Sequence, residues 1–233
     1  MTTTHAIDGS QRKAARVAGF AFLSTFVIVL IANFAIDARL NVAGDAAETA
    51  RRILAHESLF RTSIAFDLLY AAGLVVLLVA LYLVLRPVGR GPALLAAVSR
   101  LVYALMWVLM ALKSLDALRL LKGAPFLQVF DPPRLQALAK LSLGERFDLY
   151  YVGLPFFALA STICGCLWFR SGYIPKALAA VGVIASAWCV VCAFAFLVFP
   201  NFNKIVNDWL FDTPMGLFEI ALGVWLLWKG LKE

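Results

Sequence analysis

Six apolar runs, each close to the length that a helix needs to cross a lipid bilayer, dominate this chain. A hydrocarbon core about 30 Å thick requires about 20 consecutive helical residues. The runs cover residues 17–36, 62–85, 93–112, 149–169, 177–199 and 214–228. Hydrophobic residues make up 63% of the chain and charged residues 15%, which leaves too little polar surface for a soluble fold. The sequence predicts an all-α, polytopic membrane bundle of six transmembrane helices.

Residues 1–16 form a polar tail before the first run, and residues 17–230 form the predicted transmembrane domain. The first run is too long for a signal-peptide core and lacks a convincing cleavage site after it, so we expect a retained helix. The sixth run is short. It reaches full length if it includes Trp209–Phe211, or it crosses where the bilayer is thin.

Two connections carry amphipathic helix patterns. Asp45 and Glu48 form a capping box, which predicts a helix at about residues 46–56 in the 1–2 connection. Asp131-Pro132-Pro133 is typical of a helix start in the 3–4 connection, and Leu135, Leu138 and Leu141 follow at helical spacing. We expect both segments to lie on the membrane interface.

The basic residues indicate the orientation. The chain has a formal net charge of +7, and its Lys and Arg residues cluster at the tail, the 2–3 turn, the 4–5 turn and the C-terminus. They are Arg12, Lys13, Arg16, Arg86, Arg90, Arg170, Lys176, Lys229 and Lys232. This distribution is typical of cytoplasmic loops and does not indicate nucleic-acid binding. We expect a multi-pass protein of the cytoplasmic membrane with both termini in the cytoplasm and membrane lipids as its partners.

Several chemistries are excluded by residue type. The chain has only two histidines, His5 and His56, both outside the apolar runs, so a haem site or a histidine-rich iron site is not expected. Motifs for zinc proteases, serine hydrolases and nucleotide binding are absent. The Cys164–Cys166 and Cys189–Cys192 pairs lie at different depths, about 8 and 20 Å from one membrane side, which favours packing roles. No metal or cofactor is predicted.

Ionisable residues inside apolar runs are the candidate functional residues, because charge in the bilayer is energetically costly. Asp67 and Glu219 each lie about five residues, or roughly 8 Å, below the predicted outer surface. Other polar residues are expected at the same depth in other apolar runs. We predict an outward-facing polar vestibule with ligand-binding residues Asn33, Ser63, Asp67, Tyr70, Lys113, Asp116, Asp148 and Glu219.

Structural roles compete with this interpretation. Asp67 would form an ion pair with Arg61 or Lys113, and Glu219 would be paired in the same way. Arg100, in the third run, would extend toward the cytoplasmic surface. Alternatively, with Tyr103 and Trp107 on the same helix face, Arg100 would bind an anionic head group.

The segment Ser171-Gly172-Tyr173-Ile174-Pro175-Lys176 resembles a bacterial membrane family known only as domain of unknown function 4386. Glu57–Arg61, Asp67-Leu68 and Arg100 resemble the same family, and the similarity extends from Arg16 to about Lys232. The chain departs from it at residues 147–151, where many relatives have a histidine. The resemblance implies a small helical inner-membrane protein and no particular activity.

Three functions fit these observations. The first is a membrane protein whose outward-facing cavity binds a hydrophobic or lipid-like ligand. The second is an acid–base enzyme in which Asp67 and Glu219 act on a membrane-soluble substrate. The third is a small proton-coupled transporter, although the first run lacks a break to match Pro155 in the fourth.

Overall fold

The computed structural model describes residues 7–199 and 201–232. It is 86% helical, and no strand occurs within the described residues. In this part of the chain, six helical stretches are long and apolar enough to cross a membrane. They are Gly9–Leu40, Glu57–Leu85, Arg90–Lys122, Pro132–Ser171, Lys176–Val198 and Leu210–Trp228. The prediction of an all-helical membrane protein with six spans is confirmed.

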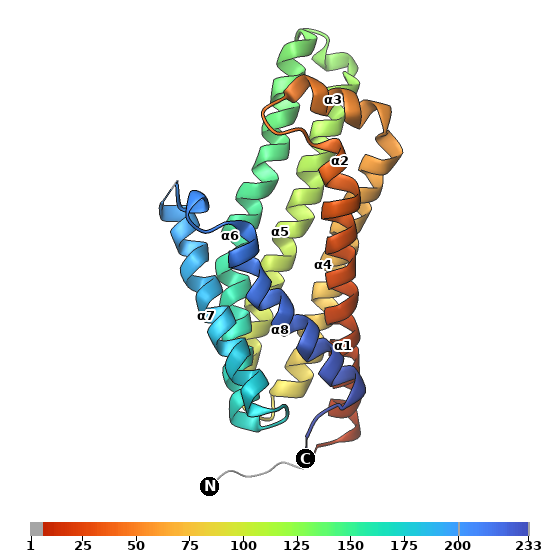
Figure 1. Ribbon diagram of the computed structural model, residues 1–233. Helices are drawn as coiled ribbons and strands as arrows, with labels where there is room; N and C mark the ends of the chain where they lie inside the picture. Colours follow the sequence, from red (N-terminus) through yellow and green to blue (C-terminus); the bar gives the residue numbers. More distant parts are fainter. Residues whose placement is uncertain (1–6, 200, 233) are drawn as a thin grey trace. The chain divides into compact units, whose positions relative to one another are not determined.

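The elements appear in Figure 1 under the following labels. In chain order they are α1 (Gly9–Leu30), the π-helix η1 (Ile31–Asp37), α2 (Ala38–Leu40), α3 (Ala46–Ala55), α4 (Glu57–Leu85), α5 (Arg90–Lys122), the 3-10 helix η2 (Pro125–Leu127), α6 (Pro132–Ser171), α7 (Lys176–Val198), the 3-10 helix η3 (Phe202–Lys204) and α8 (Asp208–Trp228). The chain divides into two compact units. Unit 1 comprises Met1–Phe26, Ala72–Ala104 and Tyr151–Glu233, and unit 2 comprises Val27–Ala71 and Leu105–Tyr150.

Several helices are longer than the apolar runs that predicted them. The largest extension is in α6, which has 40 residues and a length of about 60 Å at 1.5 Å per residue. The amphipathic helix predicted for the 3–4 connection is present, but it is the first part of α6 and continuous with the fourth span, not a separate short helix. Its predicted start at Pro132 is confirmed. The apolar runs did not predict that this segment and the fourth span form one helix, because the segment is too polar to resemble a span.

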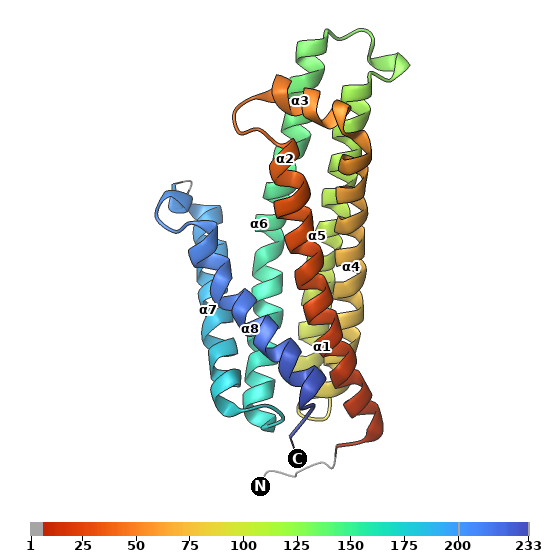
Figure 2. The same cartoon turned by 45° about the vertical axis from the view of Figure 1, so that its right-hand side comes forward.

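Unit 1 contains parts of α1, α4, α5 and α6 together with all of α7 and α8. Figures 1 and 2 show α8 running obliquely from the end of α7 toward the first turns of α1. Glycines allow the two backbones to approach at this crossing. A Cβ atom on Gly19 would lie 2.8 Å from the carbonyl oxygen of Gly223 and 2.9 Å from the amide nitrogen of Leu227. Small residues at helix contacts are typical of membrane bundles.

We expect Gly19→Ala to lower the free energy of unfolding by about 1–3 kcal/mol, because the added methyl group overpacks the α1–α8 crossing. Gly144→Ala is the matched control, since a Cβ at Gly144 would meet nothing within 4 Å. Alanine should stabilise helix α6 there by up to about 1 kcal/mol. Denaturation in detergent micelles, followed by circular dichroism, measures both changes. Equal effects of the two substitutions would contradict a close crossing.

The sixth span begins earlier than residue 214. Asn207 caps α8, and its side chain accepts a hydrogen bond from the amide of Leu210 at 2.8 Å. Pro214 lies inside the helix and has no amide hydrogen for the carbonyl of Leu210, which instead accepts from Nε1 of Trp188 on α7 at 3.4 Å. The span therefore includes Leu210 and Phe211, and Glu219 lies near the middle of α8.

Hydrogen bonds tie together one end of unit 1. Nε2 of Gln11 in α1 donates to the carbonyl oxygen of Val84 at 3.0 Å and to the hydroxyl of Tyr173 at 3.4 Å. The amide of Lys232 donates to the carbonyl oxygen of Tyr173 at 2.8 Å. The first helix, the end of α4, the α6–α7 turn and the C-terminal segment therefore meet at this end of the unit.

Unit 2 has its own apolar core. The buried residues of that core are Ile36, Leu40, Ile53, Phe60, Ile64, Ala111, Ala117, Leu118, Ala139 and Leu143. Helix α3 contributes Ile53 and lies across the other helices of the unit (Figure 2). Its predicted cap is confirmed, since Asp45 accepts from the amide of Glu48 at 2.9 Å. Hydrogen bonds from Arg51 and Arg52 lower the pKa of Glu48 to about 2.

Candidate functional site

Each unit contains a buried cluster of charged side chains. In unit 1, Arg100 of α5 forms an ion pair with Glu219 of α8 at 3.8 Å between Nη1 and Oε1. The side chain of Arg100 is 3% exposed and that of Glu219 is 19% exposed. This separation is too long for a hydrogen bond. The two groups therefore neutralise each other's charge without satisfying each other's hydrogen-bonding capacity.

The rest of the Arg100 guanidinium group is held by three neighbours. Its Nη2 donates to the hydroxyl of Ser161 on α6 at 3.0 Å. The guanidinium carbon lies 5.3 Å from the centre of the Phe157 ring and 6.0 Å from that of Phe22, which is within the range of cation–π attraction. Nη1 of Arg100 and Oε1 of Glu219 are both buried and have no hydrogen-bond partner within the described residues.

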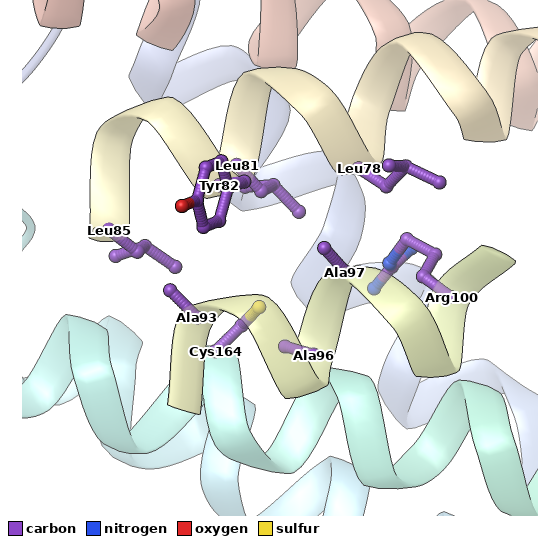
Figure 3. A pocket seen from close by; sticks show the side chains of 9 residues that line it. All are labelled: Leu78, Leu81, Tyr82, Leu85, Ala93, Ala96, Ala97, Arg100 and Cys164. Carbon is purple, nitrogen blue, oxygen red and sulfur yellow. The ribbon is translucent and has the colours of Figure 1, made fainter. Parts of the chain in front are cut away.

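Arg100 also lines a narrow groove in unit 1 (Figure 3). The lining residues are Leu78, Leu81, Tyr82 and Leu85 from α4, Ala93, Ala96, Ala97 and Arg100 from α5, and Cys164 from α6. Figure 3 shows the α4 side chains facing the small alanines of α5. Arg100 lies at one end of the groove, and Leu85 and Ala93 lie at the other. The lining is thus apolar apart from the tyrosine, the cysteine and the buried cation.

The groove contains about 210 Å³ of empty space, its open side included. Its closed part has room for about one water-sized molecule. Pockets for drug-sized ligands commonly have volumes of about 300–1,000 Å³. The groove is therefore shallow, and a ligand would have to lie along its open side.

Helix geometry places the ion pair well away from the ends of α5 and α8. Arg100 follows the start of α5 at Arg90 by ten residues, and Glu219 precedes the end of α8 at Trp228 by nine. At 1.5 Å per residue, each charge lies about 14–15 Å along its helix from that end. The pair therefore lies well inside two helices that are long and apolar enough to span a membrane, and ionisable residues inside such helices are rare and usually functional.

The second cluster, in unit 2, contains two carboxylates and one guanidinium group. Nη2 of Arg146 on α6 donates to Oδ2 of Asp67 on α4 at 2.9 Å. The same nitrogen lies 3.6 Å from Oδ2 of Asp37. Exposed fractions are 2% for the Asp67 side chain, 11% for Arg146 and 28% for Asp37. Arg146 thus holds two acids, one of them almost fully buried.

The backbone that carries Asp37 is a π-helix. Asp37 ends the π-helix η1, which also contains Asn33. π-Helical turns are rare and often occur at functional sites. On α4, Ser63 is fully buried one turn before Asp67, and its hydroxyl donates to the carbonyl oxygen of Phe60 at 2.9 Å. The cluster therefore joins η1, α4 and α6.

The other residues of the predicted vestibule do not converge on this cluster. Lys113 pairs with Glu145, and Asp116 pairs with Arg119 at 3.2 Å on the same helix. Tyr70 packs against Trp107 with ring centres 4.2 Å apart. The side chains of Asn33 and Asp148 are exposed. Glu219 is the one predicted vestibule residue that belongs to unit 1.

The predicted ion-pair partners of Asp67 are wrong. Arg61 pairs with Glu57 at 2.8 Å, one turn away on the surface of α4, and Lys113 pairs with Glu145. Asp67 instead meets Arg146 from another helix. Arg100 also does not extend toward the surface as one alternative predicted, because Ser161 and the Glu219 charge hold its guanidinium group inside unit 1.

Sequence reasoning missed Arg146, although a signal for it exists. Leu135, Ala139 and Leu143 are the buried positions of this part of α6, and Arg146 continues their spacing three residues later. The predicted apolar stripe instead included Leu138 and Leu141, which are 38% and 60% exposed. The helix face that contains residues 135, 139 and 143 also contains residue 146. This face predicts that Arg146 is buried inside unit 2, where a cation requires an acidic partner.

The fold and these buried charges define a polytopic helical membrane protein with ionisable groups inside its spans. Residues 17–230 match the family described as a domain of unknown function (DUF4386). The chain belongs to that family.

An uncharacterised protein from Archaeoglobus fulgidus is 27% identical over 154 residues, which cover 66% of this chain and 75% of that protein. No solved structure matches the chain. The family resemblance found in the sequence is thus confirmed, and these relatives supply no activity.

Proposed function

We propose that this protein binds a hydrophobic or lipid-like ligand, and that the groove beside Arg100 receives it. The observation that supports this proposal is a groove with mostly apolar walls, at one end of which the side chain of Arg100 lies. Binding sites for small molecules commonly combine apolar walls with a few polar groups. A ligand with a polar end and an aliphatic chain matches that combination.

The groove differs in place from the outward-facing vestibule predicted from the sequence. Its far end, at Leu85 and Ala93, adjoins the α4–α5 turn with Arg86 and Arg90. By the positive-inside rule, we propose that this turn and both termini face the cytoplasm and that the protein resides in the cytoplasmic membrane. The ligand would then occupy the cytoplasmic half of unit 1.

The acid–base and transport hypotheses gain no specific support from these contacts. Asp67 and Glu219 belong to different units, and each has its own arginine partner. A shared catalytic pocket is therefore not the arrangement that these contacts favour. Ligand binding requires only the groove.

Filling the groove tests the proposal. Ala97 lines the groove, whereas Val98 is 50% exposed and lies outside the lining. Ala97→Phe should remove most of the hydrophobic ligand that copurifies with the protein, and Val98→Phe should retain it. Native mass spectrometry and lipid analysis of the purified protein measure the bound material. If both variants keep the same bound molecules as the unmodified protein, the ligand does not occupy the groove.

A further inference from the structure

One end of unit 1 carries exposed cations without acidic partners. They are Arg16 of α1, Arg86 and Arg90 at the α4–α5 turn, Arg170 and Lys176 at the α6–α7 turn, and Lys229 directly after α8. None of these six side chains forms an ion pair with a residue that the structure describes. The hydrogen bonds of Gln11, Tyr173 and Lys232 tie the four segments together, and Figures 1 and 2 show them at the same end of unit 1. We call these six residues the basic end.

The segments around the basic end offer almost no compensating negative charge. Asp8 is the one acid in residues 7–20, 84–94, 168–178 and 226–232. Its Oδ1 accepts a hydrogen bond from the amide of Gln11 at 2.6 Å, at the start of α1. Because like charges at close range repel each other, an anion from outside the chain would relieve the repulsion at this end.

Unit 2 shows the opposite arrangement. On α3, Arg51 pairs with Glu48 at 2.7 Å. On α5, Arg119 pairs with Asp116 at 3.2 Å. These arginines are as exposed as those of the basic end, yet each has an acid one turn away. The uncompensated charge is therefore a property of the basic end and not of exposed arginines in this chain generally.

Exposed apolar side chains lie next to the cations of the basic end. Phe20, which is 66% exposed, follows Arg16 by four residues, and Leu94, which is 52% exposed, follows Arg90 by four. Residues four apart lie on one face of a helix, so each cation lies one turn nearer the end of its span than an exposed apolar side chain. A phospholipid has the same order of groups, with a charged head above its acyl chains. A soluble polyanion would leave the apolar side chains uncovered.

The end of α8 indicates the depth of the basic end. Trp228 is 84% exposed and is the last residue of α8, directly before Lys229. Tryptophan is enriched at the level of the lipid head groups, where its ring is partly in apolar and partly in polar surroundings. This position favours a lipid head group as the anion.

We propose that the basic end binds the phosphate groups of anionic phospholipids, whose acyl chains pack on the exposed apolar residues one turn farther into the spans. A zwitterionic phospholipid also carries an ammonium group, which these cations repel, whereas phosphatidylglycerol carries only the negative charge. The six cations are not part of the groove lining. This lipid surface is therefore independent of the ligand proposed for the groove.

Native mass spectrometry of the purified full-length protein in detergent tests the proposal. The protein is titrated with dioleoyl phosphatidylglycerol or with dioleoyl phosphatidylcholine, which share their acyl chains and differ in the head group. Phosphatidylglycerol should bind about tenfold tighter, because each Lys or Arg near an anionic head group contributes to the attraction. Glycerophosphoglycerol, the same head group without acyl chains, should not displace the lipid at equal concentration.

A double variant locates the binding surface. Arg16→Gln with Arg90→Gln should lower the preference for phosphatidylglycerol by about threefold or more. The matched control is Arg51→Gln with Arg119→Gln, which removes the same charge from arginines that already have acidic partners, and it should keep the preference. Ala97→Phe, which fills the groove, should keep it too. All four arginines are exposed, so these variants should fold.

Several outcomes would overturn the proposal. Equal affinity for the two lipids would do so on the unmodified protein alone, whether or not the variants fold. A preference that persists in the Arg16–Arg90 variant, or an equal loss in the Arg51–Arg119 control, would show that the basic end is not the binding surface. Displacement by glycerophosphoglycerol would assign it to a soluble phosphate compound. Loss of the preference in Ala97→Phe would place the phospholipid in the groove instead.

Discussion

Glu219→Leu should lower the free energy of unfolding by about 3–5 kcal/mol, because it leaves the guanidinium group of Arg100 buried without a counter-charge. Arg100 is held on several sides, by Ser161, Phe157 and Phe22. Its side chain therefore cannot reach water without disrupting the packing of unit 1. The loss should appear as a lower denaturant midpoint in detergent micelles, followed by circular dichroism.

The double variant Arg100→Met with Glu219→Leu is the matched control. It removes both charges and replaces them with apolar groups of similar size, a change that is often neutral or stabilising for buried ion pairs. Its stability should return to within about 1 kcal/mol of the unmodified protein. If the double variant is as unstable as Glu219→Leu, the loss comes from packing at Glu219 and not from the unpaired arginine.

Arg146→Met should also destabilise the protein by about 3–5 kcal/mol, because it removes the cation that Asp67 and Asp37 share. Asp67 is 2% exposed, so water cannot replace the lost hydrogen bond. The remaining carboxylates would also repel each other. Urea denaturation at neutral pH measures the effect, and the loss should be smaller in a protein that also carries Asp67→Asn.

Lys113→Met tests whether burial causes that effect. Lys113 and Glu145 also form an ion pair in unit 2, but their side chains are 38% and 37% exposed. Exposed ion pairs contribute about 0–1 kcal/mol, so this variant should stay within that range. Comparable losses for Lys113→Met and Arg146→Met would show that the Asp67 cluster has no special role in stability.

Some candidate residues were visible in the sequence because they interrupt apolar runs. Asp67, Arg100 and Glu219 stand out for that reason, and all three carry buried or partly buried charges in the structure. Arg146 did not stand out, because the segment around it is polar and looks like a connection. A conspicuous residue therefore revealed only one side of the Asp67–Arg146 pair.

The depth of Glu219 depended on where α8 begins. Pro214 suggested the start of the span, which placed Glu219 near the outer surface. The cap at Asn207 starts α8 earlier, and Trp188 satisfies the carbonyl of Leu210 that Pro214 cannot bond. A contact from α7 thus accompanies the continuation of the helix through a proline, and Glu219 lies near the middle of α8. No pattern within residues 207–228 contains that contact.

The sequence by itself determined the class of protein, the number of spans and the residues that carry charge inside them. This is possible because a bilayer demands about 20 apolar residues per helix and leaves each backbone group to be satisfied within its own helix. Only the tertiary structure decided that Asp67 meets Arg146 and that Glu219 meets Arg100 beside a groove. Helical spacing orders residues along one axis, whereas the neighbours of a buried charge depend on how separate helices pack side by side.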